Sequence, residues 1–465
     1  MTTITKSNSF VAIGSYADDT VVGSNNLISI VGLGTRLTVR GTNNQVTVTG
    51  TSQFAPDSQY DVILFQPGAL TPYGTVVVDA YNRVAVYGDD ITATLVGNDT
   101  FSLFGSINTI YANGTNDAVY VGGNGFGATG ASVDVVKGLT NGALYEQANS
   151  SVFVYGKDYC ATLVGDDTLT VSGQGAHVSA YGANNVVNVS GGASGDPDVL
   201  NFASGGVVNA TNASYVSIFG DHVTLNAKGL YASELIGSAD RAVLDKLLNF
   251  TVGGNGVAGA LDTVTFGQTA FNLFGDAVAN VLTNSNVRFN GNGANITANG
   301  SDNLVVVGSS DFVNDTGTAS RIVIGGNGEF ASAAATDSVA LKTGDTAVLL
   351  ANSTIGVENN DAATGSFARV VLTANDFVFA RPQIRFFVPI TGGNDVISSF
   401  DATDRLVLAS HYASAADLLA HTSDGLGPVR GAILQLGGGG DTLTFLGQVK
   451  SQVADFLASG AIKYS

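Results

Sequence analysis

Aspartates in short glycine-containing turns are the residues of this chain best suited to chemistry. Asp99 lies in Gly-Asn-Asp-Thr at 97–100, and Asp167 lies in the matching Gly-Asp-Asp-Thr at 165–168. Carboxylate and amide oxygens are hard ligands, so such turns have the right residue types for a hard cation. The same side chains can instead form hydrogen-bonded ladders from one turn to the next. The sequence leaves both interpretations open.

More carboxylates occur towards the C-terminus. Asp395 and Asp401 flank an expected strand, and Asp441 follows a run of four glycines. Such a run lets backbone carbonyls converge, because glycine reaches conformations that other residues avoid.

The nearest approach to a catalytic motif is a pair of aspartates. Asp196-Pro197-Asp198 resembles the Asp-Pro-His signature of alginate epimerases at two positions but lacks the histidine. Polysaccharide lyases and epimerases need carboxylates and a base that converge on one face. Here the 19 lysines and arginines are dispersed, and there is no tryptophan to stack on a sugar. Neither His-Glu-x-x-His nor Gly-x-Ser-x-Gly occurs. The sequence therefore favours a protein that is not an enzyme.

Regularly spaced glycines indicate the elements that position these residues. The spacing is nine residues at Gly14, Gly23, Gly32, Gly41 and Gly50, and it returns in 88–123 and 156–191 with one step of eight. Between the glycines, polar turn residues precede alternating apolar residues, which is typical of short strands with one buried face. The pattern predicts an all-β fold, a right-handed parallel β-solenoid of the β-helix or β-roll type.

A longer repeat lies above this spacing. Residues 83–100 align without gaps on 151–168, a shift of 68. Two further markers recur with it, an aspartate before an apolar run and the end of a valine-rich strand: Asp61, Asp134, Asp198, Asp262 and Asp337, and Val48, Val121, Val189, Val252 and Ile324. We predict a solenoid domain over 1–380, with a half-unit at 1–40 and five units of about 67 residues between about 41 and 375.

Two local features of the repeat also carry predictions. The aromatic residues that precede a glycine in each unit are expected to stack in the core: Tyr87, Tyr155, Phe219 and Phe274. Segment 238–250 is expected to be a helix, because Ser238 is a good N-cap and Leu244, Leu247 and Leu248 share a helical face.

From residue 385 onward the pattern changes to a small, mainly β module with expected helical pieces at 415–420 and 449–457. Gly-Gly-Asn-Asp-Val-Ile-x-x-Phe-Asp at 392–401, Arg-Leu-Val-Leu at 405–408 and Gly-Gly-Gly-Asp-Thr-Leu-Thr-Phe-Leu at 438–446 resemble the C-terminal target domain of serralysin-type and other repeat-in-toxin (RTX) proteins. The resemblance implies that 385–465 is an uncleaved type I secretion signal. It also implies a Gram-negative origin and folding outside the cell.

The repeat region is similar to the RTX β-roll, although the tandem nonapeptide of that family is missing. In the family, calcium lies between adjacent turns and is held by aspartates and backbone carbonyls. The resemblance thus implies calcium as a cofactor, with Asp99, Asp167, Asp395, Asp401 and Asp441 as metal ligands.

Composition excludes several classes of protein. A net charge of −19 leaves no basic footprint for nucleic acid. The one cysteine, Cys160, excludes an intrachain disulfide. The N-terminus lacks a Sec-type signal, and no apolar run reaches the ~18 residues of a membrane span.

These observations predict a secreted structural protein at the cell surface, such as a surface-layer, matrix, filament or adhesin component. Its expected partners are further copies of itself, a surface or matrix polysaccharide and the type I secretion apparatus. One alternative is a polysaccharide lyase, epimerase or binding module on a parallel β-helix. Another is an ice- or surface-binding solenoid, hinted at by threonines: Thr47, Thr92, Thr94, Thr162 and Thr170.

Overall fold

The computed structural model divides the chain into two compact units, residues 1–233 and 234–465. It describes residues 1–32, 34–49, 61–66, 74–105, 108–122, 134–191, 196–211, 215–228, 230–244, 247–256, 260–266, 278–328, 331–332, 335–361, 367–389, 393–408, 412–425, 430–437 and 440–464. Over these residues the fold is a parallel β-solenoid with two helices, which confirms the predicted all-β class.

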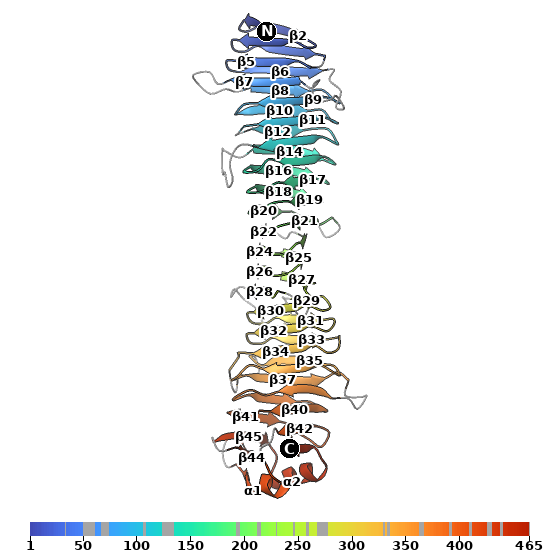
Figure 1. Cartoon of the computed structure of the whole chain (residues 1–465), viewed down its shortest axis with the longest axis vertical. Coiled ribbons are helices and arrows are strands. Elements are labelled where there is room, and N and C mark those ends of the chain that lie inside the picture. The colour runs from blue at the N-terminus through green and yellow to red at the C-terminus, as the bar shows by residue number, and fades with distance from the viewer. Residues whose placement is uncertain are drawn as a thin grey trace. The chain divides into compact units, whose positions relative to one another are not determined.

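Each turn of the solenoid in the N-terminal unit contributes one strand to each of two parallel sheets, and the strands stack turn upon turn (Figure 1). Sheet A contains β1 (Thr2–Thr5), β3 (Asp18–Val22), β5 (Arg36–Arg40), β7 (Asp61–Gln66), β9 (Arg83–Tyr87), β11 (Thr100–Phe104), β13 (Ala118–Gly122), β15 (Ala143–Glu146), β17 (Cys160–Leu163), β19 (His177–Ala180), β21 (Asp198–Phe202) and β23 (Tyr215–Phe219). Sheet B contains β2 (Phe10–Gly14), β4 (Leu27–Val31), β6 (Asn44–Thr49), β8 (Gly74–Val78), β10 (Ile91–Leu95), β12 (Thr109–Ala112), β14 (Asp134–Thr140), β16 (Ser151–Lys157), β18 (Thr168–Gln174), β20 (Asn185–Ser190), β22 (Gly206–Thr211) and β24 (Val223–Lys228).

The C-terminal unit repeats this arrangement, and β25 (Leu230–Ile236) includes the boundary between the units. Its sheet A strands are β27 (Leu247–Gly253), β29 (Val278–Val281), β31 (Asn295–Ala298), β33 (Phe312–Asp315), β35 (Asp337–Leu341), β37 (Thr354–Asn359), β39 (Phe377–Ala380) and β41 (Asn394–Ser398). Its sheet B strands are β26 (Arg241–Leu244), β28 (Asp262–Phe266), β30 (Asn286–Asn290), β32 (Asn303–Val307), β34 (Arg321–Gly325), β36 (Thr346–Leu349), β38 (Ala368–Val371), β40 (Ile384–Val388) and β42 (Arg405–Leu408).

Alternation along each strand separates the core from the surface. In β10, Ile91, Ala93 and Leu95 are buried, whereas Thr92 and Thr94 face outward. The chain then turns through Gly97, whose φ of 132° is a conformation that other residues rarely adopt. Side chains of alternate residues therefore fill the space between the sheets, as the apolar alternation predicts.

Both repeat markers, the aspartate at a strand start and the end of a valine-rich strand, recur every seven strands. The marker aspartates are the first residues of β7, β14, β21, β28 and β35. Because two strands make one turn, an odd number of strands moves each marker to the other sheet, so successive copies alternate between A and B. The count of five units stays a prediction.

Two sequence predictions are wrong. Residues 241–244 and 247–253 are strands β26 and β27 rather than part of a helix over 238–250, because parallel pairing with β28 and β29 overrides local helical spacing. The repeated aromatic residues are not a core ladder either, since Tyr87 and Tyr155 face outward with 38% and 46% of their surface exposed. Phe274 lies outside the described residues.

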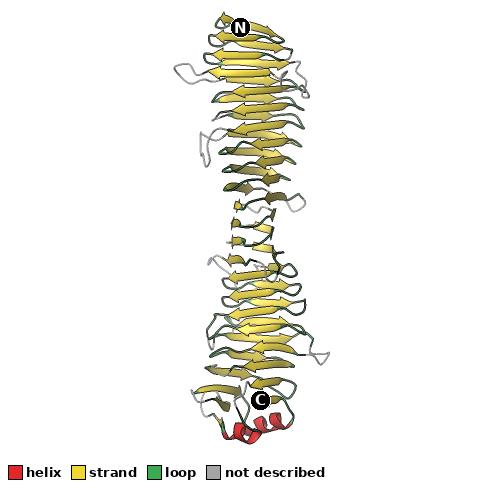
Figure 2. Ribbon diagram, viewed as in Figure 1, coloured by secondary structure: helices red, strands yellow, loops and turns green. Residues whose placement is uncertain are grey.

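The C-terminal segment continues both sheets and ends in a small antiparallel sheet with two helices (Figure 2). Strand β41 pairs in parallel with β39 and with β45 (Asp441–Leu446), and β42 pairs with β40 and β46 (Ile462–Tyr464). Next to β45 in the sheet lies the antiparallel strand β44 (Gly431–Leu436), and β43 (Thr422–Asp424) pairs antiparallel with β44. Helices α1 (Ala415–Ala420) and α2 (Lys450–Ala458) lie where helical pieces were predicted. The boundary of a separate domain at 385 stays a prediction.

Glu146, at the end of β15, is a buried carboxylic acid inside the N-terminal unit. Glu146 pairs with Val121 of the preceding sheet A strand and is only 2% exposed. Neither of its side-chain oxygens has a hydrogen-bond partner among the described residues. Burial, with smaller contributions from Asp167 and Asp134, raises the pKa of Glu146 well above its ordinary value. Burial therefore favours the protonated, neutral form of this side chain.

Replacing Glu146 with leucine is expected to stabilise the protein. Leucine has a similar size and removes a buried polar group, whose cost is about 1–3 kcal/mol. A higher midpoint of thermal unfolding for Glu146→Leu would agree. Glu146→Gln keeps a neutral polar group and should melt close to wild type, whereas a Leu variant that melts lower than the Gln variant contradicts this account.

Candidate functional site

A ladder of buried polar side chains runs along the strand starts and includes three of the five predicted metal ligands. Oδ1 of Asp99 accepts the backbone N–H of Asn82 at 2.9 Å, and Oδ1 of Asp117 accepts that of Asp99 at 3.0 Å. The same bond joins Asn26 to Ser9, Asn44 to Asn26, Asp61 to Thr35, Asn108 to Ile91, Asp134 to Asn108, Asp167 to Ser150, Asn185 to Asp167, Asp198 to Ala176, Asp262 to Asp240, Asp302 to Ser285, Asp311 to Ala294, Asp337 to Asp311, Asp345 to Ser320, Asp376 to Ser353, Asp395 to Asp376 and Asp404 to Ile384. We call this set the polar ladder.

In one class of rung, both carboxylate oxygens are already used. Oδ2 of Asp99 also accepts the N–H groups of Val96 at 3.2 Å and Gly97 at 3.1 Å. Asp167 makes the equivalent bonds to the N–H groups of residues 150, 164 and 165, at 2.8–3.0 Å. These backbone donors would compete with a calcium ion for the same oxygens. Calcium ligation by Asp99 and Asp167 stays a prediction.

In the second class, one oxygen has no hydrogen-bond partner among the described residues. Oδ1 of Asp311 accepts the N–H of Ala294 at 2.9 Å, whereas its Oδ2 is buried and unbonded. Burial raises the pKa of Asp311 to about 8, and the pKa values of Asp134 and Asp337 to about 7. A protonated aspartate resembles asparagine, the residue that occupies other rungs of the ladder.

The C-terminal metal candidates lie in three different settings. Asp395 is a rung of the polar ladder, because its Oδ1 accepts the N–H of Asp376 at 2.9 Å. Asp401 lies in an exposed turn, where its Oδ1 accepts the N–H of Thr403 at 2.7 Å. Asp441 begins β45. Across the described ranges, no three His, Cys, Asp or Glu side chains gather closely enough to hold a metal ion.

The two aspartates of the suggested catalytic motif, Asp196 and Asp198, lie in different surroundings. Asp198 is buried and bonds the N–H of Ala176 at 2.9 Å. Asp196 instead lies beside Gly175, where an added Cβ would come within 2.6 Å of its Oδ1 and 2.5 Å of Oδ1 of Asp158. The structure thus brings Asp158 and Asp196 together across an intervening turn. Sequence reasoning missed this pair, since only stacking reveals it.

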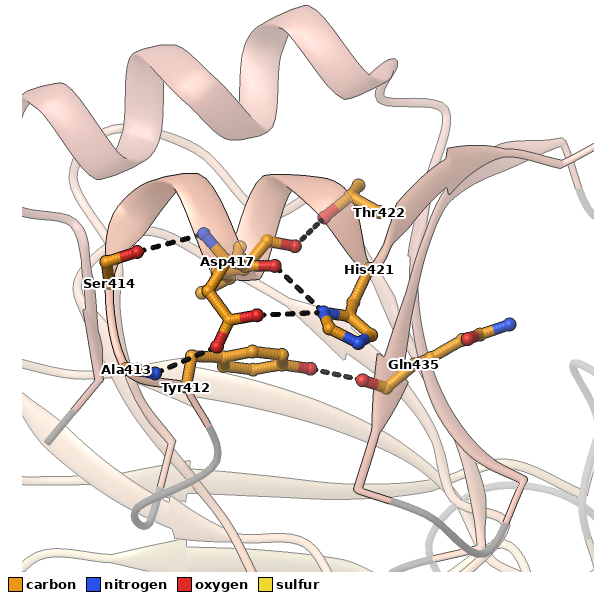
Figure 3. A network of polar contacts seen from close by, with 8 residues as sticks. Tyr412, Ala413, Ser414, Asp417, His421, Thr422 and Gln435 are labelled. Carbon is orange, nitrogen blue, oxygen red and sulfur yellow. Dashed lines mark hydrogen bonds and ion pairs between the residues drawn. The ribbon is translucent and has the colours of Figure 1, made fainter.

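A polar network in the C-terminal segment has the residue types of an acid–base site (Figure 3). His421 Nδ1 lies 3.4 Å from Asp417 Oδ1, and the hydroxyl of Tyr412 donates to the carbonyl of Gln435. Ser414 caps α1 by accepting the N–H of Asp417 at 3.1 Å. Burial, then Asp417, raises the pKa of Tyr412 to about 12, so the phenol stays protonated. These bonds hold α1 and the residues that flank it against β44, so the network has a structural role.

The outer faces carry a regular array of asparagines and a less regular set of threonines. In sheet B, Asn188, Asn209 and Asn226 follow one another in register, joined by amide hydrogen bonds of 2.8 and 3.0 Å. Thr92 and Thr94 share that sheet with Thr47 and Thr170, while Thr162 lies in sheet A. Val77 and Tyr111 flank Thr94 in its column, so the threonines do not form the continuous face expected of an ice-binding surface.

The two classes of ladder rung predict different responses to asparagine. Asp99→Asn turns an amide NH₂ towards two N–H donors and should cost about 1–3 kcal/mol. Asp311→Asn keeps the acceptor for Ala294 and should be nearly neutral, whereas Asp311→Leu loses it. Thermal unfolding and hydrogen exchange of the Asn82 and Ala294 amides measure these effects. Equal losses at both positions, or rescue of Asp99→Asn by calcium, would contradict this interpretation.

The ladder also predicts that acid stabilises the fold. The ordinary aspartate pKa is 3.8, so between that value and about 8 folded Asp311 retains a proton that the unfolded chain releases. The free energy of unfolding therefore falls as pH rises through this window. We expect a higher melting temperature near pH 5 than near pH 8. Asp311→Asn removes one titrating group and should reduce the difference, and an increase in stability towards pH 8 would refute the assignment.

Comparison of the chain with protein-family models, with curated proteins and with solved structures gives no match.

Proposed function

We propose that the protein is a secreted structural component, at a cell surface or in a matrix, that associates with further copies of itself through the edge of its solenoid. The stacked β-solenoid fold supports a structural or adhesive role. Export by the type I route rests on the motifs at 392–401, 405–408 and 438–446. No helix among the described residues is long and apolar enough to cross a membrane.

The single observation that carries self-association is the first turn of the solenoid. Among the described residues, β1 pairs only with β3, and β2 pairs only with β4. The N–H of Lys6 points to β3, where it bonds Val22 O at 2.9 Å. Because N–H groups alternate in direction along a strand, those of Thr3 and Thr5 point away from β3. An edge of this kind is a template for another strand.

The last strands of the C-terminal unit are covered within that unit. Helix α2 packs against β43, β44 and β46, and β45 is followed by antiparallel strands. Helices and loops that cover a sheet edge prevent further pairing. We therefore propose that two copies associate through their β1 edges about a twofold axis, which makes a closed pair. Larger structures would need an additional surface.

We propose that calcium from the extracellular medium binds only to carboxylates that are not part of the polar ladder. Asp401 and the Asp158–Asp196 pair have carboxylates at exposed or partly exposed turns, whereas both side-chain oxygens of Asp99 and of Asp167 already accept backbone N–H groups. A polysaccharide lyase or epimerase is the alternative function. Such an enzyme would need a base beside Asp196. Within the described residues, the neighbouring Asp198 does not supply one, because its carboxylate accepts the N–H of Ala176 as a rung of the polar ladder.

Proline at the outward N–H positions tests self-association. Thr3→Pro with Thr5→Pro removes donors that do not bond β3, and proline is tolerated at such edge positions. We expect the wild-type chain to form concentration-dependent pairs by sedimentation and electron microscopy, and the double variant to stay monomeric with an unchanged melting temperature.

Ile4→Pro is the matched control, because its N–H faces β3 and its loss should lower stability. Monomeric wild type at high concentration would overturn the proposal, as would pairs that persist in the Thr3→Pro, Thr5→Pro variant.

A further inference from the structure

A depression of about 490 Å³ lies on the outer face of sheet A in the C-terminal unit. It is formed by β33, β35, β37 and β39, which are successive strands of that sheet. Phe312 and Phe379 line it and are 42% and 44% exposed. Exposed aromatic rings beside a hollow mark a surface that binds something.

Register explains why the surface is hollow at this place. Phe312 lies opposite Ser338, Ser338 opposite Gly356, and Gly356 opposite Phe379. Two small residues thus separate two large rings in one column of outward positions. The rings are three strand spacings of ~4.8 Å apart, about 14 Å. This span suits an extended ligand rather than a single small molecule.

A charged pair forms one side of the hollow. Arg381 Nη1 lies 3.0 Å from Glu358 Oε1, and their side chains are 69% and 46% exposed. Thr336 and Ser338 add hydroxyl groups to the lining. The hollow therefore offers apolar ring faces together with a few hydrogen-bonding groups, as ligand sites do.

A peptide cannot bind here by adding a strand. Each of the four strands pairs with a neighbour on both sides, from β31 to β41, so their backbone groups are already bonded. A ligand must be held by side chains alone. A polyanion is also disfavoured, because the chain carries a net charge of −19 and Arg381 is already paired with Glu358.

We propose that this hollow binds a neutral oligosaccharide. The apolar faces of two sugar rings would stack on Phe312 and Phe379, and hydroxyl groups between them would bond Ser338 and the Arg381–Glu358 pair. The site goes beyond the proposed structural role by giving the solenoid a glycan partner. It does not depend on the β1 edge.

Calorimetric titration of the full chain with neutral linear hexasaccharides (cello-, laminari-, malto-, manno- and hexa-N-acetylchitohexaose) tests the proposal, with a galacturonate hexamer for comparison. We expect binding of at least one neutral hexasaccharide and weaker binding of the galacturonate. Phe312→Ala with Phe379→Ala should reduce that affinity at least tenfold.

Gly356→Leu provides an independent test that leaves the rings in place. A Cβ at this position meets nothing closer than Ser338 Oγ at 3.3 Å, so the variant should fold and fill the hollow. Val348→Leu, at an outward position of sheet B, is the matched control and should bind as wild type.

Three results would overturn the proposal: no neutral hexasaccharide binds, Gly356→Leu binds as well as wild type, or this face mediates association of two copies instead. The Thr3→Pro, Thr5→Pro variant should retain full saccharide binding, which distinguishes failure of this site from failure of self-association.

Discussion

The structure depends on one constraint: many of its turns must satisfy the backbone N–H that precedes a buried strand. A buried N–H without an acceptor is costly. The polar ladder supplies the acceptor from the next turn, as Asp99 does for Asn82 and Asp117 does for Asp99. Each such bond also aligns two turns, so it contributes to the strand register.

The ladder explains which parts of the fold were predictable. The marker aspartates were visible in the sequence because Asp61, Asp134 and Asp198 must each start a strand. Their chemistry was not, since calcium ligands and turn acceptors are the same residue type. The segment 238–250 was misassigned for a related reason: its leucine spacing suits a helix, and only pairing with β28 and β29 determines that it forms strands.

Features that depend on stacking escaped prediction entirely. Asp158 and Asp196 are distant in sequence, but stacking of the turns places both carboxylates beside Gly175 of the turn between them. The hollow on sheet A joins Phe312 to Phe379 through Ser338 and Gly356, and these residues are ordinary in sequence. The seven-strand repeat has the same character. Tyr87 and Tyr155 occupy equivalent repeat positions but belong to opposite sheets. One sequence motif therefore places tyrosines on the outer faces of both sheets.

The same constraint limits where function can be located. Inward positions are occupied by packed aliphatic side chains, and the first position of many strands is occupied by the ladder. Only outward positions and exposed turns are free to vary without a cost to folding. Asparagine columns, stacked aromatics and the hollow between Phe312 and Phe379 all lie there. A solenoid of this kind therefore acquires binding sites by changing the sizes of outward residues in register, while its interior and ladder stay the same.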